Sequence, residues 1–199
     1  MNKSISNPSF SKADLAFRFT PGRLCLNLVA TIGERGHRNI ERLRSPDDLA
    51  RWCVKAVILE QLPEVKHKEL EQTKQLREAI YEVTEALLGC ITPESKYIEI
   101  INYWASFPPT IPQLDLDGRT KKWTVNQPME AVMSVIARDA IDLFGSSLVN
   151  KVKACANPNC QMLFLDTSRP GNRRWCSMTG SGCGNRAKKA AFRQREKRC

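Results

Sequence analysis

The chain has 199 residues, 42% of them hydrophobic, which suffices for one sizeable core and a small additional module. No apolar run approaches the roughly 18 residues that cross a bilayer, and no apolar leader follows the N-terminus, so we expect no membrane association and a cytoplasmic location. The net charge of +10 lies at one end: residues 151–199 hold twelve Lys or Arg and two acids, while the other 150 residues hold nineteen of each. This asymmetry indicates a polyanionic partner for the C-terminal end.

The first elements in chain order are expected near residue 17. Residues 1–16 are polar and are predicted to be a flexible N-terminus, followed by an α-rich domain over residues 17–148. Leucines that alternate at 24, 26 and 28 fit a strand over residues 23–32, whereas apolar residues at 24, 28 and 32 fit a helix. We prefer the helix, and the strand remains the alternative.

Four further helices are predicted in this domain. Ser45-Pro-Asp-Asp48 begins one, because serine caps a helix, proline suits its first position and acids face the positive end of its dipole. Apolar residues at helical spacing predict a long helix from Glu64 to about Gly89, another from Thr92, and a last one from Pro128 to Gly145.

A short β-hairpin is predicted between the last two helices. Prolines at 108, 109 and 112 forbid helix and indicate an extended linker. Apolar residues then flank an Asp117-Gly118 turn, which is typical of a hairpin. They are Leu114, Leu116, Trp123 and Val125.

Apart from Cys199 at the C-terminus, the eight cysteines fall into two groups. Cys25, Cys53 and Cys90 lie among apolar neighbours and are predicted to pack in the core. Four others form two pairs with the spacing C-x4-C, fifteen residues, C-x6-C: Cys155, Cys160, Cys176 and Cys183. Two close pairs joined by a short spacer predict a tetrahedral zinc site; disulfides and iron–sulfur ligation are the weaker alternatives.

Such a zinc ion would be structural, because four thiolates leave no coordination position for a catalytic water. No acid lies between Asp166 and Glu196 to act as the glutamate of a deaminase, and no phosphate-binding glycine loop occurs. We therefore expect no enzyme activity.

The basic end is predicted to be a helix with a cationic stripe. Arg186, Lys189, Arg193 and Lys197 recur at intervals of three and four, and Phe192 is expected to dock inward. Asn185 is expected to cap this helix. Ten cations are candidate nucleic-acid contacts: Arg169, Arg173, Arg174, Arg186, Lys188, Lys189, Arg193, Arg195, Lys197 and Arg198. The alternative is a solubilising tail.

The C-terminal stretch resembles the CGNR zinc-finger family. The resemblance rests on Cys155-Ala-Asn-Pro-Asn-Cys160, Phe164-Leu-Asp-Thr-Ser168, Arg173-Arg-Trp-Cys-Ser-Met178 and Cys183-Gly-Asn-Arg-Ala-Lys188. In that family the finger follows an ABATE domain, and Gly22-Arg-Leu-Cys-Leu-Asn-Leu-Val-Ala-Thr31 looks like the start of one. The resemblance implies a bacterial, stress-induced transcription regulator whose four cysteines bind zinc and whose basic end meets DNA. The loop from Thr179 to Gly182 is two residues longer than we expect for the family.

These observations together predict a mainly α (α+β) protein: an α-rich domain with a short hairpin, then a four-cysteine zinc module over residues 149–199 that ends in a basic helix. We expect a zinc-dependent regulator that binds duplex DNA. The N-terminal domain would sense a small molecule, with Arg23, Asn27 and Thr31 as candidate pocket residues, or pair two copies in a homodimer. Internal hydrogen bonds are the alternative role for those three. A structured-RNA or ribosome-associated zinc protein is the second candidate, and an adaptor or enzyme with a solubilising tail is the third.

Overall fold

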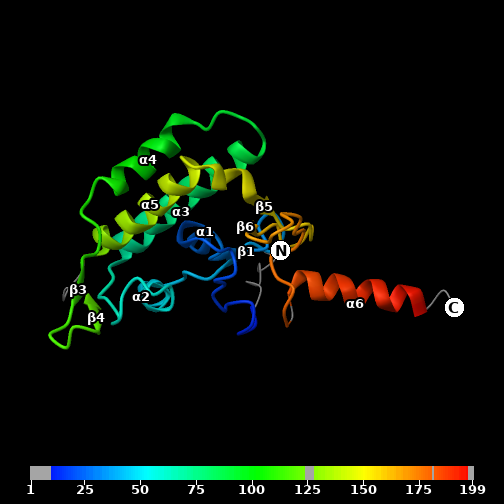
Figure 1. Ribbon diagram of the computed structural model, residues 1–199, viewed down its shortest axis with the longest axis horizontal. Coiled ribbons are helices and arrows are strands. Elements are labelled where there is room, and N and C mark those ends of the chain that lie inside the picture. The colour runs from blue at the N-terminus through cyan, green and yellow to red at the C-terminus, as the bar shows by residue number, and fades with distance from the viewer. Residues whose placement is uncertain (1–9, 124–127, 181, 197–199) are drawn as a thin grey trace, which may run out of the picture.

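The computed structural model describes residues 10–123, 128–180 and 182–196. Within these ranges a helical body is followed by a small irregular module, from which the last helix projects (Figure 1). The helices are α1 (Leu24–Val29), α2 (Pro46–Lys55), α3 (His67–Leu88), α4 (Ser95–Ala105), α5 (Met129–Phe144) and α6 (Cys183–Glu196), with a 3-10 turn at Ser147–Lys151. None of the described helices is long and apolar enough to cross a membrane.

Three two-stranded antiparallel sheets accompany the helices in the described residues. They are β1 (Ile32–Gly33) with β2 (Ile40–Glu41), β3 (Pro112–Leu114) with β4 (Lys121–Trp123), and β5 (Val152–Ala154) with β6 (Leu163–Leu165). The β3–β4 pair is the predicted hairpin, although its first strand already begins within the expected proline linker. Its turn is fixed by Asp117, whose carboxylate accepts from the backbone N–H of Arg119 and Thr120. Val125, the last residue of the predicted hairpin, lies outside the described residues.

Local signals in the sequence set the helix starts. Ser45 and Asp48 form a reciprocal capping box at α2: the Ser45 hydroxyl accepts from the Asp48 N–H, and the Asp48 carboxylate accepts from the Ser45 N–H. The long helix is confirmed as α3, three residues shorter at its start than predicted. Pro128 is the N-cap of α5 rather than its first residue.

The core lies where α1, α3, α4 and α5 meet. The α1 helix packs against both α3 and α5, so the helical interpretation is confirmed for Leu24–Val29, but Ile32, predicted on the same helix, lies in β1. Leu76 and Ile136 are fully buried there, and Trp52 of α2 is fully buried in the same cluster. Cys25 and Cys53 are also buried, as predicted, but the prediction for Cys90 is wrong: it is exposed just beyond α3, in a left-handed conformation with φ 54°.

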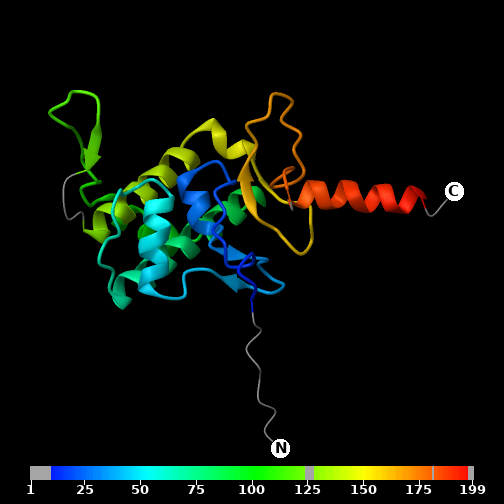
Figure 2. The same ribbon diagram turned by 90° about the horizontal axis from the view of Figure 1, so that it is seen from below.

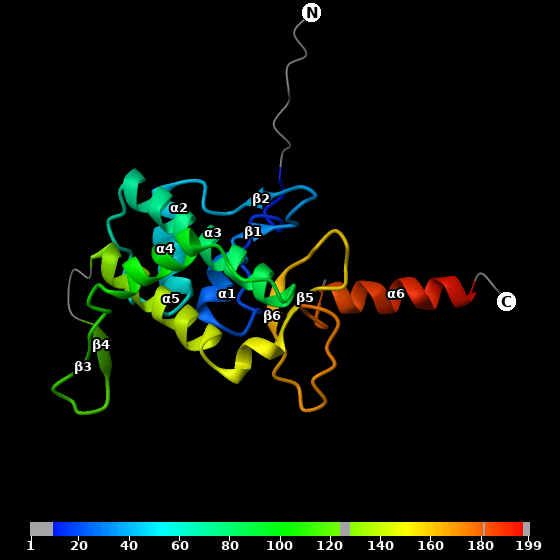
Figure 3. The ribbon, with the colours of Figure 1, turned by 90° about the horizontal axis from the view of Figure 1, so that it is seen from above.

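The helical core continues into the C-terminal module. Val152, Leu163 and Leu165 belong to the same apolar cluster as the helices. The Leu165 N–H donates to the Pro21 carbonyl, 2.8 Å away, just before α1 begins. Figures 2 and 3 show β5 and β6 lying beside α1 from opposite sides of the molecule. The module therefore packs against the helical body and is not joined to it by a linker alone.

By contrast, α6 is in contact with the rest of the protein only near its first residues. Only Cys183 and Gly184 of this helix are buried, and the helix extends away from the other elements in all three views (Figures 1 to 3). Phe192 is 61% exposed, so the expectation that it docks inward is wrong, because no described element reaches far enough along α6 to receive it.

A candidate zinc centre and its basic helix

The first cysteine pair lies on the turn after β5. The Asn157 side-chain oxygen accepts from the Asn159 N–H at 3.1 Å, and the Cys160 N–H donates to the Asn157 carbonyl at 2.8 Å. Asparagine readily forms this kind of side-chain turn, and it bends the chain so that Cys155 and Cys160 face one another.

The second pair joins a loop to the start of α6. Cys176 ends the loop and Cys183 is the first residue of the helix. The Gly184 N–H donates to the Ser177 carbonyl at 2.9 Å, which closes the turn. A Cβ at Gly184 would lie 3.0 Å from Trp175 and closer still to Met178, so a residue without a side chain fits here.

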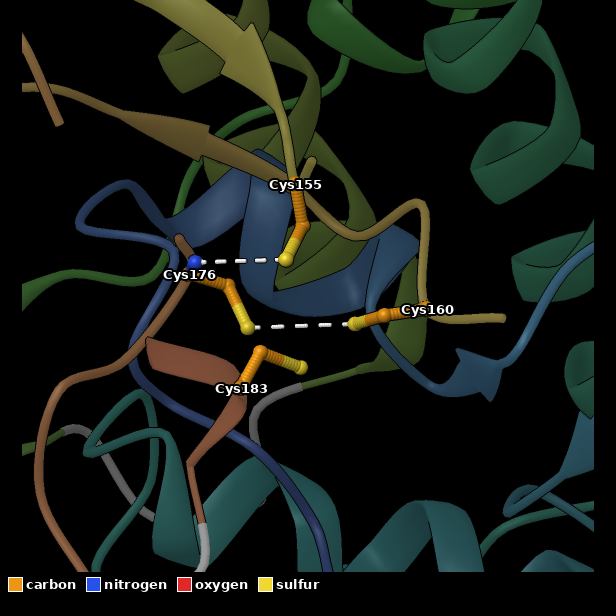
Figure 4. Close-up of side chains that lie close together, drawn as sticks. All are labelled: Cys155, Cys160, Cys176 and Cys183. Carbon is orange, nitrogen blue, oxygen red and sulfur yellow. Dashed lines mark hydrogen bonds between the residues drawn. The ribbon is translucent and has the colours of Figure 1, made fainter. Parts of the chain in front are cut away.

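The four sulfur atoms converge on one point (Figure 4). All four Sγ atoms lie within 4.8 Å of one another, and those of Cys160 and Cys176 are 3.8 Å apart. Tetrahedral zinc with Zn–S bonds of about 2.3 Å requires sulfur–sulfur separations of about 3.8 Å. A disulfide would require about 2.05 Å, so Cys160 and Cys176 have the spacing of metal ligands and not of a bridge.

The electrostatics of the cluster also fit a cation. Hydrogen bonds from Cys160 and Cys176 lower the pKa of Cys155 to about 2. The same interaction with Cys155 raises the pKa of Cys160 to about 12, and contact with both neighbours raises the pKa of Cys176. Among these three cysteines, ionisation of one thus opposes ionisation of its neighbours, and a bound divalent cation would offset that repulsion.

Further donors surround the sulfurs. The Arg186 guanidinium donates to Cys183 Sγ at 3.1 Å, and the Asn157 amide donates to the same atom at 3.4 Å. The Cys176 N–H donates to Cys155 Sγ at 3.5 Å. Such donors orient thiolate ligands and offset their charge.

A buried carboxylate braces the loop between the two pairs. Asp166 is 1% exposed and accepts from Lys153 Nζ at 2.8 Å, from the Ser168 hydroxyl at 2.6 Å and from the Arg173 N–H at 2.8 Å. The Lys153 ammonium, first among these, holds the pKa of Asp166 well below its usual range. Sequence reasoning missed this role, although the Asp-Thr-Ser sequence at 166–168 is a signal for such a side-chain turn.

The structure divides the candidate nucleic-acid residues. Arg173 lies over the Phe164 ring and donates to the Cys176 carbonyl, and Arg186 contacts Cys183, so both guanidinium groups have partners within the module. Arg186 is nevertheless exposed, as are six others: Arg169, Arg174, Lys188, Lys189, Arg193 and Arg195. Lys197 and Arg198 lie outside the described residues.

The base of α6 borders a surface groove of about 570 Å³. Trp175, Arg186 and Asn159 line it from the module, and His37 and Arg38 from the loop between β1 and β2. Asn185 does not cap α6, because the helix begins two residues earlier; its amide instead donates to the Gly180 carbonyl.

The three candidate ligand residues do not all lie at one surface pocket. Arg23 and Asn27 line one cavity. Thr31 is 1% exposed; its hydroxyl donates to the Leu28 carbonyl and accepts from Arg77. Thr31 therefore has the internal role that was the alternative for all three.

Comparison with known families covers nearly the whole of this architecture. Residues 22–147 match the ABATE family model, described as "Putative stress-induced transcription regulator", and residues 151–196 match the CGNR zinc finger. A search of curated proteins finds no match. Neither matched family is an enzyme family. The ABATE match spans more than half of the chain, and the sulfur cluster falls within the CGNR match. The chain therefore belongs to the ABATE family, and a zinc-binding CGNR finger follows its ABATE domain.

Proposed function

We propose that this protein is a cytoplasmic transcription regulator that binds duplex DNA through its zinc module and α6. In this proposal Cys155, Cys160, Cys176 and Cys183 are the zinc ligands, and the ion has a structural role. The observation that carries the proposal is the isolation of α6: it projects from the zinc centre with its cations in solvent and Glu196 as its single acid.

The shape of α6 favours DNA over duplex RNA. Fourteen residues of helix span about 21 Å, and the described residues of α6 after its first turn are largely exposed, so that part of the helix can enter a groove from the side. The major groove of B-DNA is about 12 Å wide and admits a helix. The major groove of A-form RNA is too deep and narrow for this, so a structured RNA would have to be bound by other features.

The test is a salt titration of binding to duplex DNA, with structured RNA and heparin as competitors. Each phosphate contact contributes about 0.9 to the slope of log K against log salt. Replacing Lys188, Lys189, Arg193 and Arg195 by Gln should therefore reduce the steepness of this negative slope by up to about 3.6. Stronger competition by structured RNA than by unlabelled duplex would favour the RNA-binding alternative.

A matched control removes four charges from exposed residues that precede the zinc module: Lys12, Arg44, Lys68 and Arg119, each replaced by Gln. This control has the same net charge as the α6 variant and should keep the slope of the unmodified protein. If both variants lose the same affinity, binding depends on overall charge and not on α6, and the proposal is wrong.

The ABATE domain is proposed to regulate this binding, either by sensing a small molecule or by forming a homodimer. Sedimentation equilibrium distinguishes the second possibility.

A further inference from the structure

The cations of α6 are not spread evenly around the helix. Successive residues of an α-helix turn by about 100°. With this spacing Arg186 and Arg193 lie on one side of α6, and Lys188 and Arg195 lie on the opposite side, about 180° away. Lys189 lies toward the back of the first pair. The helix therefore carries two separate rows of positive charge along its length.

A broad face without charge separates the two rows. It spans about 180° from Arg186 to Arg195 and consists of Ala187, Ala190, Ala191 and Gln194. Ala190, Ala191 and Gln194 are exposed. Ala187 and Ala190 also border the groove of about 570 Å³ at the base of α6, so this uncharged face is open down to the zinc module.

The other gap between the two rows is narrower and contains an acid. Phe192 and Glu196 lie there, between Lys188 and Lys189. Directed at DNA, this side would place the Glu196 carboxylate near phosphates, which repel it. The charge distribution therefore selects the uncharged face as the side that meets a polyanion.

This arrangement matches the geometry of a helix in the DNA major groove. Base edges form the floor of that groove, and the phosphates of the two strands form its rims. The rows of cations lie about 90° to either side of the centre of the uncharged face, so each row faces one rim. Methyl side chains at 187, 190 and 191 let the helix approach the floor closely.

Gln194 lies near the centre of the uncharged face. It is exposed, and no described residue hydrogen bonds to its amide. A glutamine amide offers a donor and an acceptor side by side, which pair with N7 and N6 of adenine. Asn185, the other amide on α6, is on the far side of the helix and already donates to the Gly180 carbonyl.

A second protein helix fits this face less well. The three alanines would bury little apolar area, and the large apolar side chain of α6, Phe192, lies elsewhere on the helix. Two copies of α6 would also bring like charges together. The uncharged face therefore favours a polar, negatively charged partner.

We propose that the uncharged face of α6 lies on the floor of the DNA major groove, where the Gln194 amide hydrogen bonds to an adenine edge. The two rows of cations contact phosphates on both rims. This inference rests on the proposed function and adds to it which side of α6 meets DNA and which residue reads the sequence.

The first test selects bound sequences from randomised duplex DNA with the zinc-loaded full chain. Adenine should be required at one position. Gln194→Ala should remove that requirement and weaken binding to the selected site about tenfold, and Gln194→Arg should change the requirement to guanine, because arginine pairs with O6 and N7 of guanine. Phe192→Arg adds the same charge on the other side and should leave the selected sequence unchanged.

The second test places the same acid on two sides of α6. Ala190→Glu and Phe192→Glu have equal net charge, so they differ only in the direction of the carboxylate. Ala190→Glu should weaken duplex binding at least about tenfold more than Phe192→Glu, because its carboxylate faces the groove. Zinc content and helical circular dichroism should be the same in both variants.

The outcomes separate this inference from the proposed function. If the zinc module and α6 bind duplex DNA but Gln194→Arg selects the same sequence as the unmodified protein, the regulator stands and the assignment of Gln194 is wrong. Equal losses in Ala190→Glu and Phe192→Glu would show that the uncharged face does not meet the groove. No duplex binding by the unmodified protein would overturn both.

Discussion

Removing zinc should unfold the two cysteine turns and leave the helical body folded together with β5 and β6, whose Val152, Leu163 and Leu165 belong to its core. The apolar cluster within the module has one fully buried large side chain, Phe164, whose burial stabilises by about 1.5–3 kcal/mol. Structural zinc in small fingers contributes about 10–16 kcal/mol. Whole domains are stable by only about 5–15 kcal/mol, so the cysteine turns cannot stay folded once the contribution of zinc binding is lost.

Hydrogen exchange with and without a zinc chelator measures this directly. Three amides report on the module because their bonds hold it together: Cys155 to Met162, Ala156 to Arg174 and Gly184 to Ser177. They should lose protection, while amides in the middle of α3 and α5 should keep it.

The variant Cys176→Ser should reproduce the effect of the chelator, and Cys90→Ser, a change at an exposed cysteine outside the cluster, should not. Full protection of the module amides in metal-free protein would refute the reasoning.

Three further predictions follow from individual contacts. Arg186→Met removes a donor to Cys183 Sγ and should weaken zinc affinity about 10- to 100-fold in competition with a chelating dye, whereas Lys189→Met should not. Ala190→Gly with Ala191→Gly costs about 2 kcal/mol of helix propensity and should weaken duplex binding about thirtyfold at unchanged zinc content, because nothing else supports α6. Leu76→Ala should lower the free energy of unfolding by about 2–5 kcal/mol in urea titrations.

The last two predictions have clear controls. Leu116 is fully exposed in the hairpin turn, so Leu116→Ala should change the free energy of unfolding by less than about 0.5 kcal/mol. Unchanged duplex affinity in the α6 double-glycine variant would mean that the helix is not the bound form.

What the sequence predicted well depends on near neighbours. The capping box at Ser45 and Asp48 involves residues three apart, and each cysteine pair is made by one turn of the chain. These features need no knowledge of the tertiary fold, so spacing alone identified them. The family resemblance supplied the order of the two segments.

What it could not predict depends on distant contacts. Thr31, a candidate ligand residue, is instead buried and accepts a hydrogen bond from Arg77, 46 residues away. Arg186 has the periodicity of a solvent-facing cation, but the turn that brings Cys183 back also brings a sulfur to its guanidinium. Cys90 has apolar neighbours in sequence, yet it lies just beyond α3 in a left-handed conformation and is exposed.

The strand β6 has a consequence for how this protein can evolve. The two family matches are separated by three residues, and such a gap suggests parts that recombination could exchange freely. Yet Leu163 and Leu165 of β6 are part of the core of the ABATE domain, and the Pro21 carbonyl accepts its hydrogen bond from the same strand. A recombination event in that gap would join an ABATE domain to a finger whose β6 does not fit its core. The two domains should therefore be inherited together, with substitutions in β6 matched by substitutions in the core residues that it contacts.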